Sequence, residues 1–304
     1  MSHTVSYSEL DTLRQCRLKH HLAYKERWRS SGDTPPALSR GSLFHKIMEA
    51  HYLMLRSRYR TQTVIDELID PLSYLTDDEE SELVRWMYDG YRDVYGDDTS
   101  WEILAVELRV ERWLLTDAGR LSRFKLKGII DLLVRDNSAG GGLWIIDHKT
   151  CRTLPKDKDF DLDDQFGLYT YLLRRPNAIQ GLGIDSALAR KDGSLDIRGV
   201  IHNAVRTERL KREMQPSERF ARTLTTRTDT ELKIIASEAL DTFEEGYREG
   251  PSSTLRGGLP PRSPNPDTCK WRCGYTEPCL SSRKGQDIHG LLEDYGYVVD
   301  PLRH

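Results

Sequence analysis

Residues 101–150 constrain the fold most strongly, because apolar and polar side chains alternate there along three consecutive segments. The segments are 101–115, 124–134 and 143–150, and a period of two residues is typical of strands that bury one face. The glycine-rich stretch 137–142 joins the last two segments, which predicts a β-hairpin. We therefore expect a sheet whose first strand has an apolar face formed by Leu104, Val106, Leu108 and Val110.

Helical spacing flanks these strands on both sides. Ser6 and Glu9 form a capping-box pattern, which predicts a helix that runs on to Tyr24. We expect His20 on the surface of this helix. A second capping-box pattern at 76–79 predicts the start of another helix. Further helices are expected at 42–59, 163–175 and 229–247, and weaker strands at 184–190 and 197–205.

The 304 residues contain 45 lysines and arginines against 48 aspartates and glutamates, which gives a net charge of −3. This balance excludes a protein that coats nucleic acid with a uniformly basic surface, but it is compatible with a local basic groove. No run of about 18 apolar residues is present, so no membrane-spanning helix is expected. The first residues lack the apolar region of a signal peptide. We therefore expect a cytoplasmic protein with no membrane partner, from a bacterium or from a phage in its host.

Two acidic residues and a lysine lie in the predicted hairpin. Asp131 interrupts an apolar run, and a carboxylate in such a place needs a partner, most simply a cation. Asp147 and Lys149 are two residues apart and point to the same side of a strand, opposite to His148. Two carboxylates on adjacent strands can hold magnesium, and a lysine beside them can orient water. These are components of metal-assisted phosphodiester hydrolysis.

Three of the five cysteines, Cys269, Cys273 and Cys279, fall within eleven residues, whereas Cys16 and Cys151 lie far from them in the sequence. In a reducing compartment, clustered thiols favour a metal site over disulfides. Zinc and an iron–sulfur cluster each take four ligands, so the fourth ligand has to come from elsewhere. The remaining alternative is a loop with three unligated cysteines.

Four motifs follow one another in a characteristic order: GSLFH ending at His45, GIIDLL with Asp131, IIDHKT with Asp147 and Lys149, and QFGLY from Gln165 to Tyr169. This set resembles the PD-(D/E)XK nuclease superfamily, in its RecB-like exonuclease branch. The resemblance implies an α/β fold of the restriction-endonuclease type, with a mixed sheet flanked by helices. It implies one domain over 1–304, with a catalytic core at 41–175.

The resemblance also implies a chemistry, which is hydrolysis of DNA with Mg²⁺ or Mn²⁺. It assigns metal binding to Asp131, Asp147, His45 and the main-chain carbonyl of His148. Lys149 would position or activate the attacking water, and Gln165 and Tyr169, which share one helix face, would position DNA. Glu107 resembles an acidic position before the hairpin, and it would contact either a second metal or a basic neighbour, or else face solvent.

Some relatives in this branch, including AddB and the CRISPR-associated adaptation exonucleases, carry a 4Fe–4S cluster on one N-terminal and three C-terminal cysteines. Cys16, Cys269, Cys273 and Cys279 occur in that order here. The resemblance therefore implies a 4Fe–4S cluster that joins 1–40 to 250–304 as a structural staple.

The sequence is thus interpreted as a metal-dependent DNA exonuclease, with endonuclease activity left open, acting on single strands or DNA ends. Its setting would be recombination, repair, replication or CRISPR-type processing, beside a helicase, a recombinase or a CRISPR adaptation protein. One alternative is a non-catalytic module that holds DNA ends for such a partner. The other is a zinc-stabilised enzyme or scaffold with a different substrate.

Basic residues cluster after the predicted strand at 197–205, at Arg206, Arg209, Lys211, Arg212, Arg219, Arg222 and Arg227. Such a track suits the phosphates of a nucleic-acid strand. The alternative is a solvated charged surface that nearby glutamates neutralise.

Overall fold

The computed structural model describes residues 2–32, 36–58, 70–138, 141–248 and 258–300. The chain forms two compact units. The first comprises 1–33, 111–127 and 237–304, and the second comprises 34–110 and 128–236. Among the described helices, none has both the length and the apolar character that a bilayer crossing requires.

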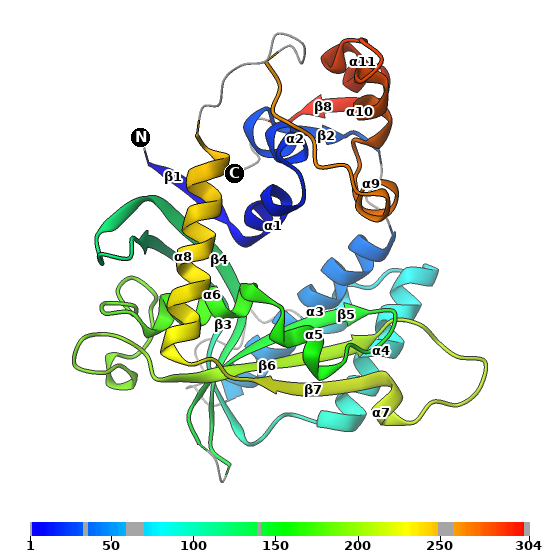
Figure 1. Ribbon diagram of the computed structural model, residues 1–304. Coiled ribbons are helices and arrows are strands. Elements are labelled where there is room, and N and C mark those ends of the chain that lie inside the picture. Colours follow the sequence, from blue (N-terminus) through cyan, green and yellow to red (C-terminus); the bar gives the residue numbers. More distant parts are fainter. Residues whose placement is uncertain (1, 33–35, 59–69, 139–140, 249–257, 301–304) are drawn as a thin grey trace. The chain divides into compact units, whose positions relative to one another are not determined.

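The second unit is built on a mixed sheet (Figure 1). Its strands are β3 (Trp101–Leu115) and β4 (Leu121–Asp136), of which 101–110 and 128–136 belong to this unit, and β5 (Leu143–Cys151), β6 (Ile197–Arg206) and β7 (Phe220–Thr225). β4 pairs with β3 and, antiparallel, with β5; β5 and β6 are parallel, and β6 and β7 are antiparallel. The predicted hairpin and the predicted strand at 197–205 are confirmed.

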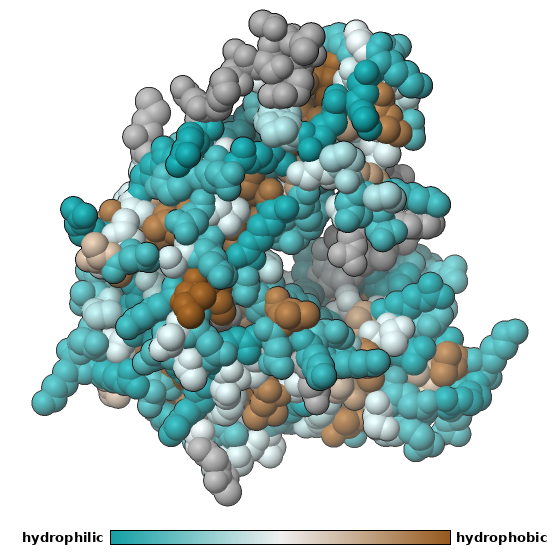
Figure 2. Space-filling model, in the orientation of Figure 1, coloured by the Kyte–Doolittle hydropathy of each residue, from teal (hydrophilic) through white to brown (hydrophobic). Residues whose placement is uncertain are grey.

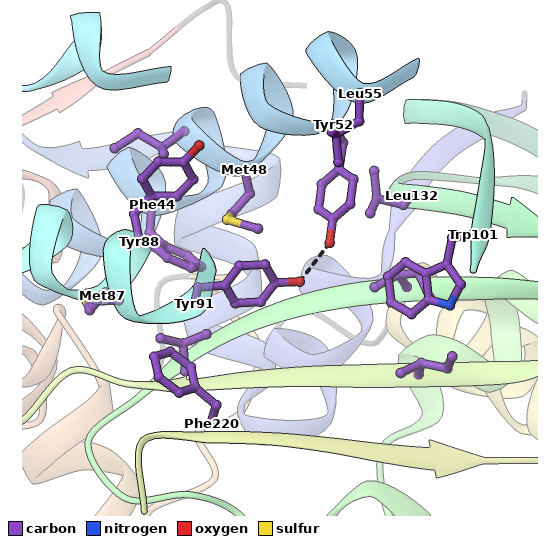
Figure 3. Packing of buried hydrophobic residues seen from close by; sticks show 14 of the residues in the cluster. Phe44, Met48, Tyr52, Leu55, Met87, Tyr88, Tyr91, Trp101, Leu132 and Phe220 are labelled. Carbon is purple, nitrogen blue, oxygen red and sulfur yellow. Dashed lines mark hydrogen bonds between the residues drawn. The ribbon is translucent and has the colours of Figure 1, made fainter. Parts of the chain in front are cut away.

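Helices pack against this sheet. They are α3 (Pro36–Arg58), α4 (Glu79–Tyr95), α5 (Asp157–Asp161), α6 (Asp164–Arg174) and α7 (Pro216–Arg219), with 3₁₀ turns at Pro71–Tyr74 and Ser186–Leu188. α3 and α4 contribute Phe44, Tyr52 and Tyr91 to a buried cluster that also takes in Ile146 and Phe220 of the sheet (Figure 3). The helices predicted at 42–59 and 163–175 are confirmed, although the first begins earlier, at Pro36.

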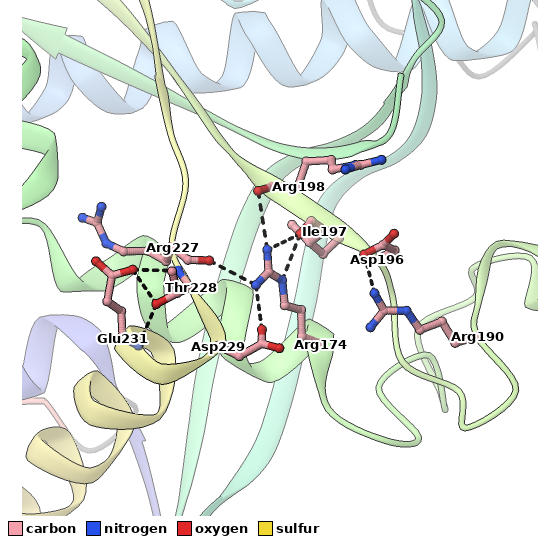
Figure 4. Close-up of polar contacts among 9 residues, drawn as sticks. All are labelled: Arg174, Arg190, Asp196, Ile197, Arg198, Arg227, Thr228, Asp229 and Glu231. Carbon is pink, nitrogen blue, oxygen red and sulfur yellow. Dashed lines mark hydrogen bonds and ion pairs between the residues drawn. The ribbon is translucent and has the colours of Figure 1, made fainter. Parts of the chain in front are cut away.

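The end of α6 is fastened by a single side chain (Figure 4). The Arg174 guanidinium donates twice to the carbonyl oxygen of Ile197, at 2.9 and 2.6 Å. It also donates to the carbonyl of Arg227 at 3.1 Å and to Asp229 Oδ1 at 2.8 Å. Arg174 therefore connects α6 to the first residue of β6 and to the start of α8 (Asp229–Gly246).

The first unit contains short elements from both ends of the chain. They are β1 (His3–Ser6), α1 (Tyr7–Gln15), α2 (Arg17–His20), a π-helix at His21–Lys25, β2 (Trp28–Ser30), α9 (Pro266–Arg272), α10 (Thr276–Ser282), α11 (Ile288–Asp294) and β8 (Tyr297–Val299). β2 and β8 are antiparallel partners. A small core made of Leu18, Leu22, Trp28, Tyr275, Ile288 and Leu292 brings these segments together. The helix predicted at 229–247 is confirmed as α8, whose last residues belong to this unit.

The predicted N-terminal helix is correct at its start and wrong in its length. The Ser6 side chain accepts a hydrogen bond from the N–H of Glu9, as the capping box requires. The helix ends at Gln15, the next residue Cys16 is extended, and α2 and the π-helix follow. His20 is not a surface residue: its Nε2 lies 2.8 Å from Glu9 Oε1, and both side chains are buried. The buried carboxylate needs that partner, so a histidine is kept inside.

Two other expectations are corrected. α4 is capped by Asp78, whose side chain accepts from the N–H of Ser81, and not by Thr76. The segment 184–190 forms a 3₁₀ turn and one isolated bridge between Ala189 and Leu195 instead of a strand. Asp185 accepts a hydrogen bond from the N–H of Ala187, and such local capping competes with strand pairing.

The face of the molecule drawn in Figure 2 is mostly hydrophilic, with apolar residues scattered over it. This agrees with a composition of 31% charged residues. Isolated exposed apolar side chains are normal on soluble folds and need no ligand to explain them.

Candidate active site

The pairing of β4 and β5 brings the two predicted metal-binding aspartates together. Leu132 pairs with Ile146 at the end of this antiparallel ladder, and Asp131 and Asp147 are the next residues on the two strands. Facing positions of neighbouring strands share one side of the sheet, so both carboxylates project from the same face. Lys149 projects from that face too, and its Nζ lies 3.3 Å from Asp147 Oδ1. The sequence-based placement of these three side chains is confirmed.

Asp131 is held in position from two directions. Its Oδ2 accepts a hydrogen bond of 2.7 Å from the main-chain N–H of His148. The Nδ1 atom of His45, on α3, lies 3.5 Å from the same oxygen. The motif on α3 and the motif on β4 are 86 residues apart in the chain, and the tertiary structure makes them neighbours.

A group of potential metal ligands forms around this carboxylate. Ligand atoms of His45, Glu107 and Asp131 all lie within 4.8 Å of one another. The three residues line a cavity of about 630 Å³, together with Gly41, Ser42, Lys46, Glu49, Ile129 and Thr150. Glu107, for which the sequence left a solvent-facing role open, therefore lies among the potential ligands.

A bulge-like irregularity in β3 turns Glu107 into the cavity. Before it, Trp101, Ile103 and Ala105 are buried, whereas after it the buried residues are Leu108 and Val110. Glu107 has a φ of +49°, a conformation that is unusual for a residue with a side chain. One residue in this conformation shifts the alternation of a strand. The expected apolar face of β3 is therefore right for Leu108 and Val110, which are buried, whereas Leu104 and Val106 are only half-buried, and of these two Val106 packs against the core.

The electrostatics of the site call for a cation. Burial raises the pKa values of Asp131 and Asp147, and burial together with Asp131 and Glu49 raises the pKa of Glu107 to about 7. Asp147 Oδ2 is buried and has no hydrogen-bond partner among the described residues. Carboxylate oxygens with an imidazole suit magnesium or manganese, so the residues present fit the metal that the motifs imply.

Lys149 is a positive side chain that forms an ion pair with one of these acids, Asp147. Burial disfavours its charge, but Asp147, Asp163 and Asp131 overcome this effect, and its pKa lies above the ordinary value. Its Nζ also donates to Oε1 of Gln165 at 3.4 Å. The ammonium group of Lys149 is thus held beside the carboxylates.

The two residues predicted to position DNA lie next to this lysine. Gln165 and Tyr169 share one face of α6, and Gln165 Nε2 donates to the Tyr169 hydroxyl at 3.4 Å. The Tyr169 ring packs against Gly128 of β4, where a side chain would leave no room for it. The four motifs of the sequence thus converge within the second unit.

The four predicted cluster ligands lie in the first unit. Cys16, Cys269, Cys273 and Cys279 all line one cavity of about 60 Å³. Among the described residues, no three of these thiols come within 4.8 Å of one another. Four sulfurs around one zinc ion would lie about 3.8 Å apart, given a Zn–S bond of roughly 2.3 Å. Cys151 lies in the other unit, where its thiol faces the carbonyl of Val205.

Most of the predicted basic track is neutralised locally. Arg206, Arg212, Arg222 and Arg227 form ion pairs with Glu208, Glu218, Asp98 and Asp161, respectively. Arg209 and Arg219 lie over the Trp86 ring. Of the two interpretations, these contacts favour the neutralised charged surface.

Two features of the site were missed. Glu49 follows His45 by one helical turn and lines the same cavity, and that spacing in the sequence is the signal that could have found it. A buried polar network behind β5, which includes Asp98, Asn203 and Arg222, has no motif that marks it. Its members come from segments that lie far apart in the sequence.

One of three comparisons with known proteins shows the family of this chain. The family model described as "PD-(D/E)XK nuclease superfamily" matches residues 4–280. A solved structure titled "Crystal structure of SSO0001" is similar at 14% identity, over 77% of this chain and 84% of that one, with a TM-score of 0.26. No curated protein matches. The mixed sheet flanked by helices is consistent with a restriction-endonuclease-like fold, and this chain belongs to the PD-(D/E)XK nuclease superfamily.

Proposed function

We propose that this nuclease is a metal-dependent DNA exonuclease that acts on single strands or DNA ends. The observation that carries the proposal is the arrangement around Asp131, where ligand atoms of His45 and Glu107 lie within 4.8 Å, beside the Asp147–Lys149 pair. Members of this superfamily generally use Mg²⁺ or Mn²⁺ on DNA. We assign the metal to Asp131, Asp147, His45 and the His148 carbonyl.

Each side chain has a definite task in this proposal. A bound divalent ion would polarise the scissile phosphate and lower the pKa of water. Lys149, held between Asp147 and Gln165, orients the attacking water and offsets negative charge as it develops on the phosphate. Gln165 and Tyr169 position the DNA strand. Glu107 supplies a further carboxylate, either to the same ion or to a second one.

The test is a cleavage assay with Mn²⁺ on end-labelled single- and double-stranded DNA. Lys149→Ala is compared with Lys191→Ala, which changes an exposed lysine in the turn before β6. We expect the wild type and Lys191→Ala to shorten DNA stepwise from an end, and Lys149→Ala to be inactive. Internal cuts without shortening from the ends would instead show an endonuclease. An inert wild type that still binds DNA would favour the alternative, a module that holds DNA ends.

We further propose that Cys16, Cys269, Cys273 and Cys279 hold a 4Fe–4S cluster. Four thiols that line one cavity are a suitable donor set for such a cluster. Such a cluster would connect the N-terminal segment 1–40 to the C-terminal segment 250–304. Its role would be structural.

Protein purified without oxygen is the material for this second test. The wild type should be brown, absorb near roughly 400 nm and contain iron and acid-labile sulfide. Cys16→Ser should lose this absorbance, and Cys151→Ser, which changes the cysteine outside the group, should keep it. A colourless wild type that contains zinc would refute the cluster.

These features together support a finer placement. We propose that the chain belongs to the RecB-like branch and works as one nuclease domain over 1–304, with its catalytic core at 41–175. The proposed setting is the cytoplasm, in DNA recombination, repair, replication or CRISPR-type processing. A helicase, a recombinase or a CRISPR adaptation protein is the expected partner.

A further inference from the structure

A hydrogen-bonded network of polar side chains lies buried on the side of β5 opposite to Lys149. It joins α3, α4, β5, β6, β7 and the turn before β3 through Tyr52, Tyr91, His148, Asn203, Arg222 and Asp98. All of these residues belong to the second unit. None of them is needed for the chemistry proposed above, apart from the main chain of His148.

An ion pair forms one end of the network. The Arg222 guanidinium donates to both carboxylate oxygens of Asp98, at 2.6 and 2.9 Å. It also donates to the Tyr91 hydroxyl at 2.7 Å, and the Tyr52 hydroxyl donates to Asp98 at 2.7 Å. The side chain of Asp98 is only 4% exposed and that of Arg222 is 19% exposed. The planar guanidinium is therefore held in one orientation between the strands and the helices.

Asn203 links this ion pair to β5. Its Nδ2 donates to the Tyr91 hydroxyl at 2.8 Å and lies 2.8 Å from Nδ1 of His148. Its Oδ1 accepts from Arg222 Nε at 3.4 Å. Asn203 is also the strand partner of His148 in the parallel pairing of β5 and β6. Every polar atom of the Asn203 side chain is thus committed to fixing its neighbours.

His148 forms the other end of the network, next to the proposed metal site. Its ring is fully buried and stacks on Tyr52, with 5.6 Å between the ring centroids. Its main-chain N–H donates to Asp131 Oδ2 at 2.7 Å. Tyr52 lies seven residues after His45 on α3, so the helix that carries the proposed imidazole ligand contacts the same ring. The position of the His148 ring therefore affects both sides of the site.

The energetic cost of the network argues for a function. Burying a charged pair with its hydrogen-bonding groups is expensive, and an apolar set of similar volume is often equally stable or more stable. The same core already contains many apolar residues, among them Met87 and Ile146. Residues that hold metal ligands in place through hydrogen bonds typically affect metal affinity or activity by about 10- to 100-fold.

We propose that Asn203 is a positioning residue of the active site, which the Asp98–Arg222–Tyr91 group holds in place. Asn203 fixes the His148 ring, and the ring fixes the peptide that donates to Asp131. This inference rests on the proposed metal-dependent nuclease. It adds a group of residues, on the far side of the sheet, that determines how well the site binds its metal.

The test compares Asn203→Leu with Met87→Ala. The first variant keeps the approximate volume and removes the hydrogen bonds. The second removes buried volume from the same core without touching the network, which costs about 2–5 kcal/mol. Mn²⁺ affinity is measured by calorimetric titration, and cleavage kinetics are measured well below both unfolding midpoints. We expect Asn203→Leu to weaken Mn²⁺ binding or lower kcat by about 10- to 100-fold, with little change in KM for DNA.

Met87→Ala should lower the unfolding midpoint and leave Mn²⁺ affinity and kcat unchanged. If Asn203→Leu does not fold, Tyr91→Phe replaces it, because it removes one hydroxyl and keeps the ring; a smaller loss of Mn²⁺ affinity is expected. Unchanged Mn²⁺ affinity and kcat in the folded network variant would overturn the inference. A wild type that neither binds Mn²⁺ nor cleaves DNA would instead overturn the proposed function.

Discussion

A Cβ atom built on Gly128 would lie 2.3 Å from Cε1 of Tyr169, so the absent side chain of this glycine makes the space for the tyrosine ring. Gly128 is the first residue of the motif that contains Asp131, and Tyr169 is the last residue of the motif on α6. The two motifs therefore specify a single contact between β4 and α6. The tyrosine can lie beside Lys149 and Gln165 only because β4 has a glycine at that position.

We expect Gly128→Ala to lower the free energy of unfolding by about 1–3 kcal/mol, because the added methyl group forces the Tyr169 ring to move. The same substitution in a Tyr169→Ala background should cost far less, since the ring is gone. Urea denaturation of both single variants and the double variant gives the coupling energy. Strictly additive losses would show that the contact does not exist.

We expect His202→Leu to stabilise the protein by about 1 kcal/mol at pH 7.5. His202 is fully buried against Phe160, and neither ring nitrogen has a partner among the described residues. An apolar side chain removes that unsatisfied polar group. His20→Leu is the control, because it leaves the buried carboxylate of Glu9 without its imidazole and should cost about 3 kcal/mol. If both substitutions lower the free energy of unfolding, the predicted stabilisation by His202→Leu is wrong.

The same histidine predicts a pH dependence. Burial, with contributions from Lys149 and Arg227, lowers the pKa of His202 to about 3. The unfolded chain takes up a proton near the ordinary pKa of about 6.5, whereas the folded protein does not. The free energy of unfolding should therefore fall as the pH drops from about 6.5 towards 3. The advantage of His202→Leu over the wild type should be larger at pH 5 than at pH 7.5 in denaturant titrations.

Glu107→Gln should stabilise the metal-free protein at pH 8 and have no effect near pH 4. The pKa of Glu107 is raised to about 7, so the folded protein retains a proton that the unfolded chain releases above about pH 4.5. The stability that this group contributes is lost as the pH rises towards 7. The exposed Glu238→Gln serves as the control. Melting curves without metal at the two pH values check both predictions.

The same variant should also respond less to metal. Mn²⁺ should raise the melting temperature of the wild type, because binding stabilises only the folded state. Glu107→Gln should show a smaller rise if Glu107 is a ligand. An equal rise in melting temperature in both proteins would show that Glu107 is not a metal ligand.

Arg174→Met should lower the free energy of unfolding by about 2–3 kcal/mol, since the carbonyl of Ile197 loses a charged donor. Arg190→Met is a matched control from the same region (Figure 4), where an arginine pairs with Asp196 at the surface. Exposed pairs of that kind contribute about 0–1 kcal/mol. Similar losses of unfolding free energy in the two variants, measured by chemical denaturation, would show that Arg174 does not stabilise the end of α6.

Local patterns were sufficient to predict much of the second unit. The alternation in 124–134 and 143–150 predicts the hairpin, and the spacing of Asp147 and Lys149 predicts their common side, because side chains alternate strictly along a strand. The same rule was less successful for Leu104, which is only half-buried. The backbone conformation of Glu107 shifts the alternation of β3, and no glycine or other turn-forming residue at that position indicates the shift in the sequence.

The sequence alone determined which groups this protein brings to the site, namely the acids, the lysine, the histidine and the glutamine–tyrosine pair. Only the tertiary structure decided that Glu107 joins His45 and Asp131, that Gly128 accommodates Tyr169, and that Asn203 holds His148. The physical reason is the distance along the chain over which each kind of interaction acts. Strand alternation and helix spacing act over a few residues, whereas these contacts join segments from different strands and helices. They form once burial has selected one packing of the helices on the sheet.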